Sequence, residues 1–89
     1  MISQNDKAKI LDIAEKYHAK KVILFGSSSD PLKESSDIDL AVEGIPHAEF
    51  FKFYSDLIFS LSKPVDLVDL TRNNRFNKIV AEEGLVLYG

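Results

Sequence analysis

Residues 21–42 read KVILFGSSSDPLKESSDIDLAV, with one apolar run at each end of a polar segment. The first run is short and continuous, which is typical of a strand covered on both faces. It ends at Gly26 and Ser27, and after nine more residues Asp37 and Asp39 begin the second run. Because side chains alternate along a strand, we expect both carboxylates to project from the same face of the sheet.

These groups together suit the binding of a phosphate that carries a metal ion. A glycine turn can present backbone N–H groups to an anion, and paired carboxylates supply the oxygen ligands that Mg²⁺ prefers. An Asp-x-Asp pair by itself is more often a solvated strand edge, and a serine-rich segment by itself is more often a turn. The combination of all these features favours a functional site.

Composition narrows the class of protein. A chain of 89 residues has room for one domain, residues 1–89, with one modest core. A net charge of −3 argues against non-specific binding of nucleic acid, which needs a basic face. The sequence contains no cysteine, which excludes disulfides, zinc–thiolate sites and a thiol nucleophile.

The sequence also predicts where the protein resides. No apolar run approaches the roughly 20 residues of a membrane span. The N-terminal residues MISQNDK are too polar for a signal peptide. We therefore expect a cytoplasmic protein that does not contact a membrane.

The N-terminal half is predicted to form one helix and two strands. The helix covers residues 4–18, can be capped by Ser3 or Asn5, and buries a stripe of apolar residues at helical spacing. Residues 27–36 form a loop or a single helical turn, and residues 38–43 form the second strand. This connection is too short for a parallel crossover, so we expect the first two strands to be antiparallel.

The longest predicted helix covers residues 47–62. Its apolar face contains Phe50, Tyr54, Leu57, Ile58 and Leu61, with Phe51 and Phe53 at the flanks. Phe59 falls on the opposite face. A lone exposed aromatic residue usually has no function, but aromatic residues are enriched at interfaces, so Phe59 is kept as a candidate partner contact.

The remaining elements complete a small α/β (α+β) fold. A strand over residues 65–70 follows the long helix and should be parallel to the second strand. A short helix over 73–83 should turn Phe76, Ile79 and Val80 inward and stop at Gly84, before an edge strand over 85–88. The result is a mixed sheet of about four strands with helices packed mainly on one face.

Asp66 interrupts the apolar strand that we expect beside Asp37 and Asp39. If the strand registers match, these three carboxylates converge, whereas Asp69 faces the other way. Clustered carboxylates repel one another, and a divalent cation is the usual solution. Oxygen-only ligands favour Mg²⁺ or Mn²⁺, and two ions could share such a cluster.

These motifs resemble those of the nucleotidyltransferase superfamily typified by DNA polymerase beta. The shared pattern is Gly26-Ser27, nine residues, Asp37-x-Asp39, and a further Asp in the next strand. The segments LFGS, SDIDL, VDLV and GLVLY are similar to the minimal nucleotidyltransferases (MNT), which are antitoxin partners of HEPN-domain toxins.

The resemblance implies a nucleotidyltransferase-like fold and a set of roles. Gly26 and Ser27 would hold the triphosphate of ATP, and Asp37 and Asp39 would bind the metal ions. Asp66 would complete the metal site and help to activate the acceptor hydroxyl. The implied reaction transfers AMP from ATP to a tyrosine of a HEPN toxin and so silences it.

One segment departs from the family pattern. Members usually carry an Arg directly after Gly-Ser, whereas here the next residues are Ser28, Ser29, Asp30 and Pro31, with Lys33 the nearest basic residue. Arginine is hard to replace at a bidentate phosphate contact. A second interpretation is therefore a module that neutralises its partner by binding alone, and a third is a structural domain whose acids bind a cation for stability. The sequence leaves the nucleotide, the acceptor residue, the metal and the oligomeric state open.

Overall fold

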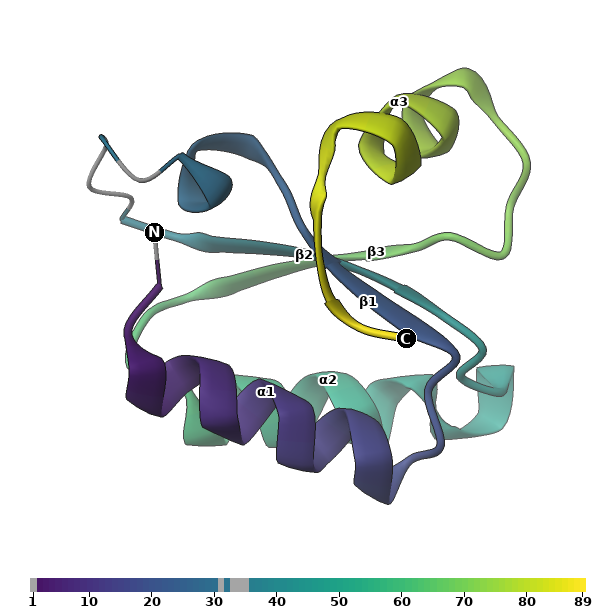
Figure 1. Ribbon diagram of the computed structural model, residues 1–89. Coiled ribbons are helices and arrows are strands. Elements are labelled where there is room, and N and C mark those ends of the chain that lie inside the picture. The colour runs from purple at the N-terminus through teal and green to yellow at the C-terminus, as the bar shows by residue number, and fades with distance from the viewer. Residues whose placement is uncertain (1, 31, 33–35) are drawn as a thin grey trace.

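The computed structural model of the protein describes residues 2–30, 32 and 36–89. A four-stranded sheet runs through its middle in the order β3-β2-β1-β4 (Figure 1). The strands are β1 (Lys21–Leu24), β2 (Ile38–Glu43), β3 (Val65–Asp69) and β4 (Leu85–Tyr88). Strand β1 is antiparallel to β2 and β4, and β2 is parallel to β3. The predicted mixed sheet, its strand directions and its C-terminal edge strand are all confirmed.

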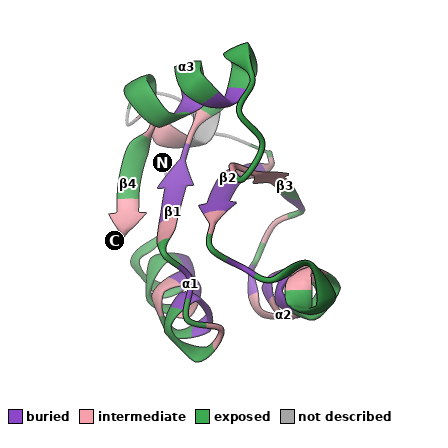
Figure 2. Cartoon of the chain, turned by 90° about the vertical axis from the view of Figure 1, so that its right-hand side faces the viewer, coloured by how far each residue is buried: buried purple, intermediate pink, exposed green. Residues whose placement is uncertain are grey.

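In the described part of the chain, three α-helices pack around this sheet. Helices α1 (Gln4–Lys16) and α2 (Phe50–Ser60) lie side by side against one face, whereas α3 (Arg75–Glu83) lies on the opposite side, close to the end of β1 (Figures 1 and 2). Short 3-10 helices, η1 (Gly26–Ser29) and η2 (His47–Glu49), follow β1 and precede α2. Among the described residues, no helix is long and apolar enough to cross a membrane.

The main core lies between the sheet and the α1–α2 layer, where buried residues of the strands and helices form one hydrophobic cluster. Figure 2 shows the buried segments of β1, β2, α1 and α2. Ile10, Ile13 and Ala14 of α1 are buried there, as their spacing predicts. The helix begins where the Ser3 hydroxyl accepts a hydrogen bond from the backbone N–H of Asp6 at 3.1 Å. This bond satisfies one of the N–H groups that a helix start leaves without an intrahelical partner.

The centre of the apolar face of α2 differs from the prediction. The spacing predicts Phe53 at the flank and Ile58 within the face, but Phe53 is 1% exposed and Ile58 is 48% exposed. The reason is that α2 packs against α1 as well as the sheet. The Phe53 ring contacts the Tyr17 ring edge-on, with the ring centroids 5.5 Å apart. Helical spacing locates an apolar stripe, but neighbouring elements decide which part of it is buried.

Helix α3 also buries less than its spacing predicts. Val80 is buried with Ile23 and Ala41 in a small second cluster, but Phe76 and Ile79 are 54% and 45% exposed. The helix covers only part of its sheet face, so a single narrow stripe is buried. The buried Asn77 side chain anchors it by donating hydrogen bonds to the carbonyls of Asp69 and Arg72.

Candidate active site

The register of β2 on β3 places Asp39 beside Asp66. The two strands are parallel, and Asp39 is the direct partner of Asp66. Along β2, Ile38, Leu40 and Val42 belong to the core under α1 and α2, so Asp39 projects from the opposite face. Both carboxylates therefore lie on the side of the sheet that α3 and η1 cover in part.

Asp39 has a carboxyl group whose pKa is raised above its ordinary value. Partial burial is the largest cause, followed by electrostatic repulsion from Asp66 and a hydrogen bond with the Asp66 side chain. Repulsion from Asp37 raises the pKa further. The site thus disfavours a negative charge on Asp39 unless a cation or proton compensates it.

Asp37 lies directly before β2, near enough for its charge to help raise the pKa of Asp39. Within residues 2–30, 32 and 36–89, however, no three Asp, Glu, His or Cys side chains are grouped closely enough to hold a metal ion. Carboxylates repel one another without a cation between them, so side chains alone do not draw such a group together. The joint metal role of Asp37, Asp39 and Asp66 stays a prediction.

The turn that follows β1 rests directly on Asp39. Gly26 has a φ of +65°, and a Cβ added to it would lie 2.7 Å from Oδ2 of Asp39. The backbone N–H of Phe25 donates to the Asp39 carbonyl at 3.0 Å, and the Ser29 hydroxyl donates to the Gly26 carbonyl at 2.8 Å. Only glycine fits this left-handed position so close to the carboxylate.

The polar segment after β1, residues 27–36, is described only in part. The helical turn beginning near Ser27 is confirmed as η1, but the side chains of Ser27 and Ser28 lie outside the described part of the structure. Pro31 and Lys33 also lie outside the described residues. The hydroxyl role of Ser27 is therefore retained as a prediction.

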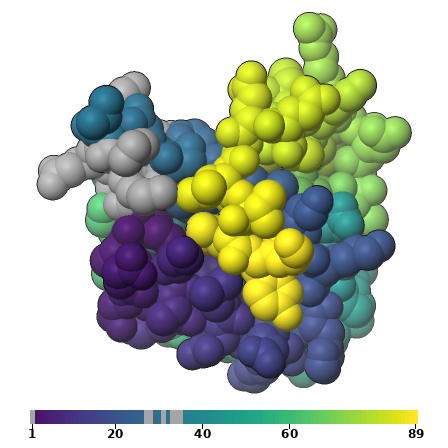
Figure 3. All heavy atoms as spheres, in the orientation of Figure 1, coloured from purple at the N-terminus to yellow at the C-terminus, as the bar shows by residue number. Residues whose placement is uncertain are grey.

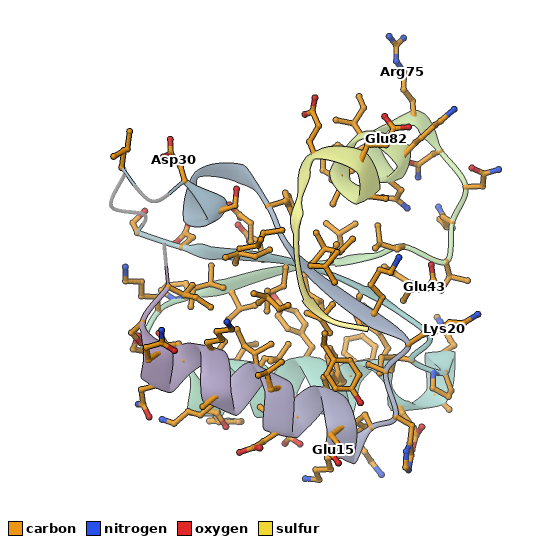
Figure 4. All side chains as sticks on the ribbon, in the orientation of Figure 1. Glu15, Lys20, Asp30, Glu43, Arg75 and Glu82 are labelled. Carbon is orange, nitrogen blue, oxygen red and sulfur yellow. The ribbon has the colours of Figure 1, made fainter. Side chains whose placement is uncertain are left out.

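A pocket of about 330 Å³ opens between η1 and α3, next to the acidic pair. Its lining consists of one face of α3 and the end of β1 with the following turn: Phe25, Gly26, Ser29, Phe76, Ile79, Val80, Glu83 and Gly84. Figure 3 shows the hollow between the blue η1 region and the yellow-green α3, and Figure 4 labels Asp30 and Glu82 on its two sides. Sequence reasoning missed this pocket because it assigned Phe76 and Ile79 to the core.

Comparison with known families matches residues 8–89 to the family described as Polymerase beta, Nucleotidyltransferase. The chain belongs to this nucleotidyltransferase family. The resemblance inferred from the Gly-Ser and Asp-x-Asp motifs is therefore confirmed. No curated protein matches the chain.

Several solved structures with the same fold are of toxin–antitoxin pairs. A crystal structure of a toxin–antitoxin with AMP-PNP shares 27% identity with this nucleotidyltransferase at a TM-score of 0.75, covering 93% of this chain and 73% of that one. The toxin–antitoxin MntA–HepT shares 25% identity at a TM-score of 0.72, with 98% and 73% covered. A complex of the tri-AMPylated Shewanella oneidensis HEPN toxin with its MNT antitoxin shares 26% identity at a TM-score of 0.72, with 97% and 71% covered.

Proposed function

We propose that this nucleotidyltransferase is metal-dependent, transfers AMP from ATP to a tyrosine hydroxyl of a HEPN-domain partner, and acts as its antitoxin. The observation that carries the proposal is the pairing of Asp39 with Asp66 beside Gly26. The similar structures support the choice of nucleotide and partner, since one contains AMP-PNP and another an AMPylated HEPN toxin.

The donor set fits a divalent cation. Burial and repulsion from Asp66 and Asp37 raise the pKa of Asp39, which supports a site where a cation would compensate the negative charge. Asp37, Asp39 and Asp66 offer only oxygen ligands, so they would hold Mg²⁺ or Mn²⁺, and two ions could share them. When bound, such ions neutralise charge that develops on the phosphoryl oxygens and orient the triphosphate.

The chain itself would position the reactants. Backbone N–H groups at Gly26 and Ser27 in η1 would hold the triphosphate, as turns of this kind do for anions. The acceptor oxygen would form a bond to the α-phosphorus while the bond to the pyrophosphate leaving group breaks. Asp66, which is exposed, would accept the proton of the acceptor hydroxyl and pass it to solvent.

A second function is favoured by a different observation. Phe59 is 88% exposed on α2, on the side of the molecule away from the acidic pair, and Ser28 stands where the family usually has Arg. In this alternative the domain retains the fold and neutralises its HEPN partner by docking alone. Aromatic side chains of this kind are enriched at the cores of protein interfaces.

The deciding experiment mixes the protein, the HEPN partner, Mg²⁺ and ATP labelled in the α-phosphate. The proposal expects label on the partner, and a loss of transfer of roughly 100-fold or more in Asp39→Ala, because removing a metal ligand costs at least as much as removing a group behind it. Asp12→Ala removes an exposed carboxylate from α1 and is the matched control that should keep transfer. If no label moves and the Asp37→Ala/Asp39→Ala double variant still neutralises the partner, the docking function stands and the enzymatic one fails.

A further inference from the structure

The pocket between η1 and α3 has the size and lining of a small-molecule site. Its volume is about 330 Å³, and its walls are mostly apolar with a few polar groups. Ligand pockets in proteins range from about 300 to 1,000 Å³ and have this mixed lining. An occupant of this pocket would therefore be a small, partly apolar molecule with one or two polar groups.

Phe76 gives the pocket an aromatic surface. The ring is 54% exposed although it sits on a packed helix, and it contacts the Phe25 ring edge-on at a centroid distance of 6.0 Å. That contact holds the Phe76 ring in place from one side and leaves other parts of it open. An ordered, partly exposed aromatic ring can stack on a nucleobase whatever its identity.

Glu83 adds a polar edge at the C-terminal end of α3. Its carboxylate accepts hydrogen bonds only, so it would pair with an N–H group of a ligand. A carboxylate in the pocket also works against a phosphate group lying there, because the two charges repel. The chemistry of the lining thus favours the base of a nucleotide over its phosphates.

The pocket is continuous with the acidic site through one residue. Gly26 lines the pocket, and the same residue lies so close to Asp39 that a Cβ on it would approach Oδ2 to 2.7 Å. A ligand held by the η1 backbone next to Asp39 therefore has the pocket as its immediate neighbour. Nucleotides have this layout, with charged phosphates at one end and an aromatic base at the other.

We propose that the η1–α3 pocket is the nucleobase subsite, in which Phe76 stacks on the base and Glu83 accepts a hydrogen bond from an N–H group on its edge. This inference rests on the proposed function, since it names where the base of that nucleotide lies. Phe76 and Glu83 are binding residues in this arrangement and take no part in bond formation.

The test measures the binding of two probes in Mg²⁺ by titration calorimetry, namely AMP-PNP and inorganic tripolyphosphate, which has no base. Phe76→Ala should raise the Kd for AMP-PNP by roughly 5- to 100-fold, the range seen when a base loses its stacking partner. The Kd for tripolyphosphate should stay unchanged. Phe76→Leu keeps the apolar volume should the alanine variant not fold, and Phe51→Ala, which removes a phenyl ring that is 80% exposed on α2, is the matched control.

The Kd of Glu83→Gln for AMP-PNP provides a second test, in which a lost hydrogen bond and a lost charge have opposite effects. Removing a negative charge near an anionic ligand should tighten binding, whereas loss of a charge-assisted hydrogen bond should weaken it. We expect the Kd for AMP-PNP to rise about threefold to tenfold. Glu82→Gln removes the neighbouring charge, which lies outside the pocket lining, and should not weaken binding.

The outcomes separate the two levels of the proposal. If the native protein binds both probes and the Phe76 variants bind AMP-PNP as it does, the subsite is wrong while the proposed function stands. If the Phe76 variants slow transfer to the partner without changing AMP-PNP affinity, the pocket holds the acceptor ring and the inference is overturned. If the native protein binds neither probe, both the subsite and the proposed function fail.

Discussion

Asp39 and Asp66 are direct partners on the parallel strands β2 and β3, and the charge on Asp66 helps to raise the pKa of Asp39 on the face opposite the main core. The residues are separated by helix α2 in the sequence, so the crossover that returns the chain to the sheet creates the pair. Gly26 packs directly against this pair, because its lack of a side chain leaves space for the Asp39 carboxylate. The site is therefore a product of strand register and of one left-handed turn.

Asp39→Asn should stabilise the metal-free protein at neutral pH. Burial and the charge on Asp66 raise the pKa of Asp39 in the folded state, so folding disfavours its ionised form. The stability that this carboxyl group contributes is full below its unfolded pKa of about 3.9 and is lost as the pH rises through the higher folded value. Thermal unfolding in chelator should therefore show a variant that melts above the native protein at pH 7.

The same comparison at low pH provides the control for that prediction. Near pH 3 the native carboxyl group is protonated in both folded and unfolded states, so the advantage of Asp39→Asn should shrink towards zero. Asp12→Asn, at an exposed position on α1, should leave the melting temperature close to native at both pH values. A native protein that melts above Asp39→Asn in chelator at pH 7 would contradict the argument.

Mg²⁺ should raise the melting temperature of the native protein and have little effect on Asp39→Asn. A ligand that binds only the folded state stabilises it by mass action, by about 2.7 kcal/mol at a concentration 100 times its Kd. Thermal unfolding with and without Mg²⁺ measures this directly. Equal stabilisation of both proteins would place the cation somewhere other than at Asp39.

Gly26→Ala should lose both stability and transfer activity. An alanine at a φ of +65° costs about 1–2 kcal/mol, and its Cβ would push against Oδ2 of Asp39. Gly44→Ala is the matched control, because Gly44 has a φ of +91° and its Cβ would lie 2.6 Å from Cβ of Lys20, on a turn far from the acidic pair in the fold. Chemical unfolding should show both variants destabilised, but transfer per folded molecule should fall only in Gly26→Ala.

Local pattern was enough to predict the strands and their directions, because strand alternation and a short β1–β2 connection allow few alternatives. It predicted that Asp39 and Asp66 meet only if the registers of their strands match, and the structure supplies that register. Local pattern does not predict contacts between elements that are distant in the sequence. Asp6, in the first turn of α1, is 2% exposed and accepts hydrogen bonds from the backbone N–H and the hydroxyl of Ser62, a contact that spacing along the sequence does not predict. The half-exposed Phe76 was missed for the same reason, since periodicity does not reveal how much of a helix its sheet covers.

The stability that the polar contact between α1 and α2 contributes should depend on pH. The Tyr17 hydroxyl donates to Oδ2 of Asp56 at 2.7 Å, and the Lys16 ammonium group lies 3.1 Å from the same oxygen. These hydrogen bonds lower the pKa of Asp56, and the bond to Asp56 raises the pKa of Tyr17. The hydrogen bond between Tyr17 and Asp56 therefore stabilises the folded state most near neutral pH, where the Asp56 carboxylate is ionised and the Tyr17 hydroxyl is protonated.

Tyr17→Phe tests this link because it keeps the ring that packs edge-on against Phe53 and removes only the hydroxyl. The depressed pKa of Asp56 gives stability that is present above its unfolded value of about 3.9 and is lost as the pH falls through the folded value. The raised pKa of Tyr17 gives stability that is present below about 10 and is lost as the pH rises through the folded value. Thermal unfolding across pH should therefore show the variant below the native protein near pH 7 and the two converging at both extremes. Lys16→Met should change the melting temperature less, because an exposed ion pair contributes little, and a Tyr17→Phe deficit that stays constant with pH would refute the link.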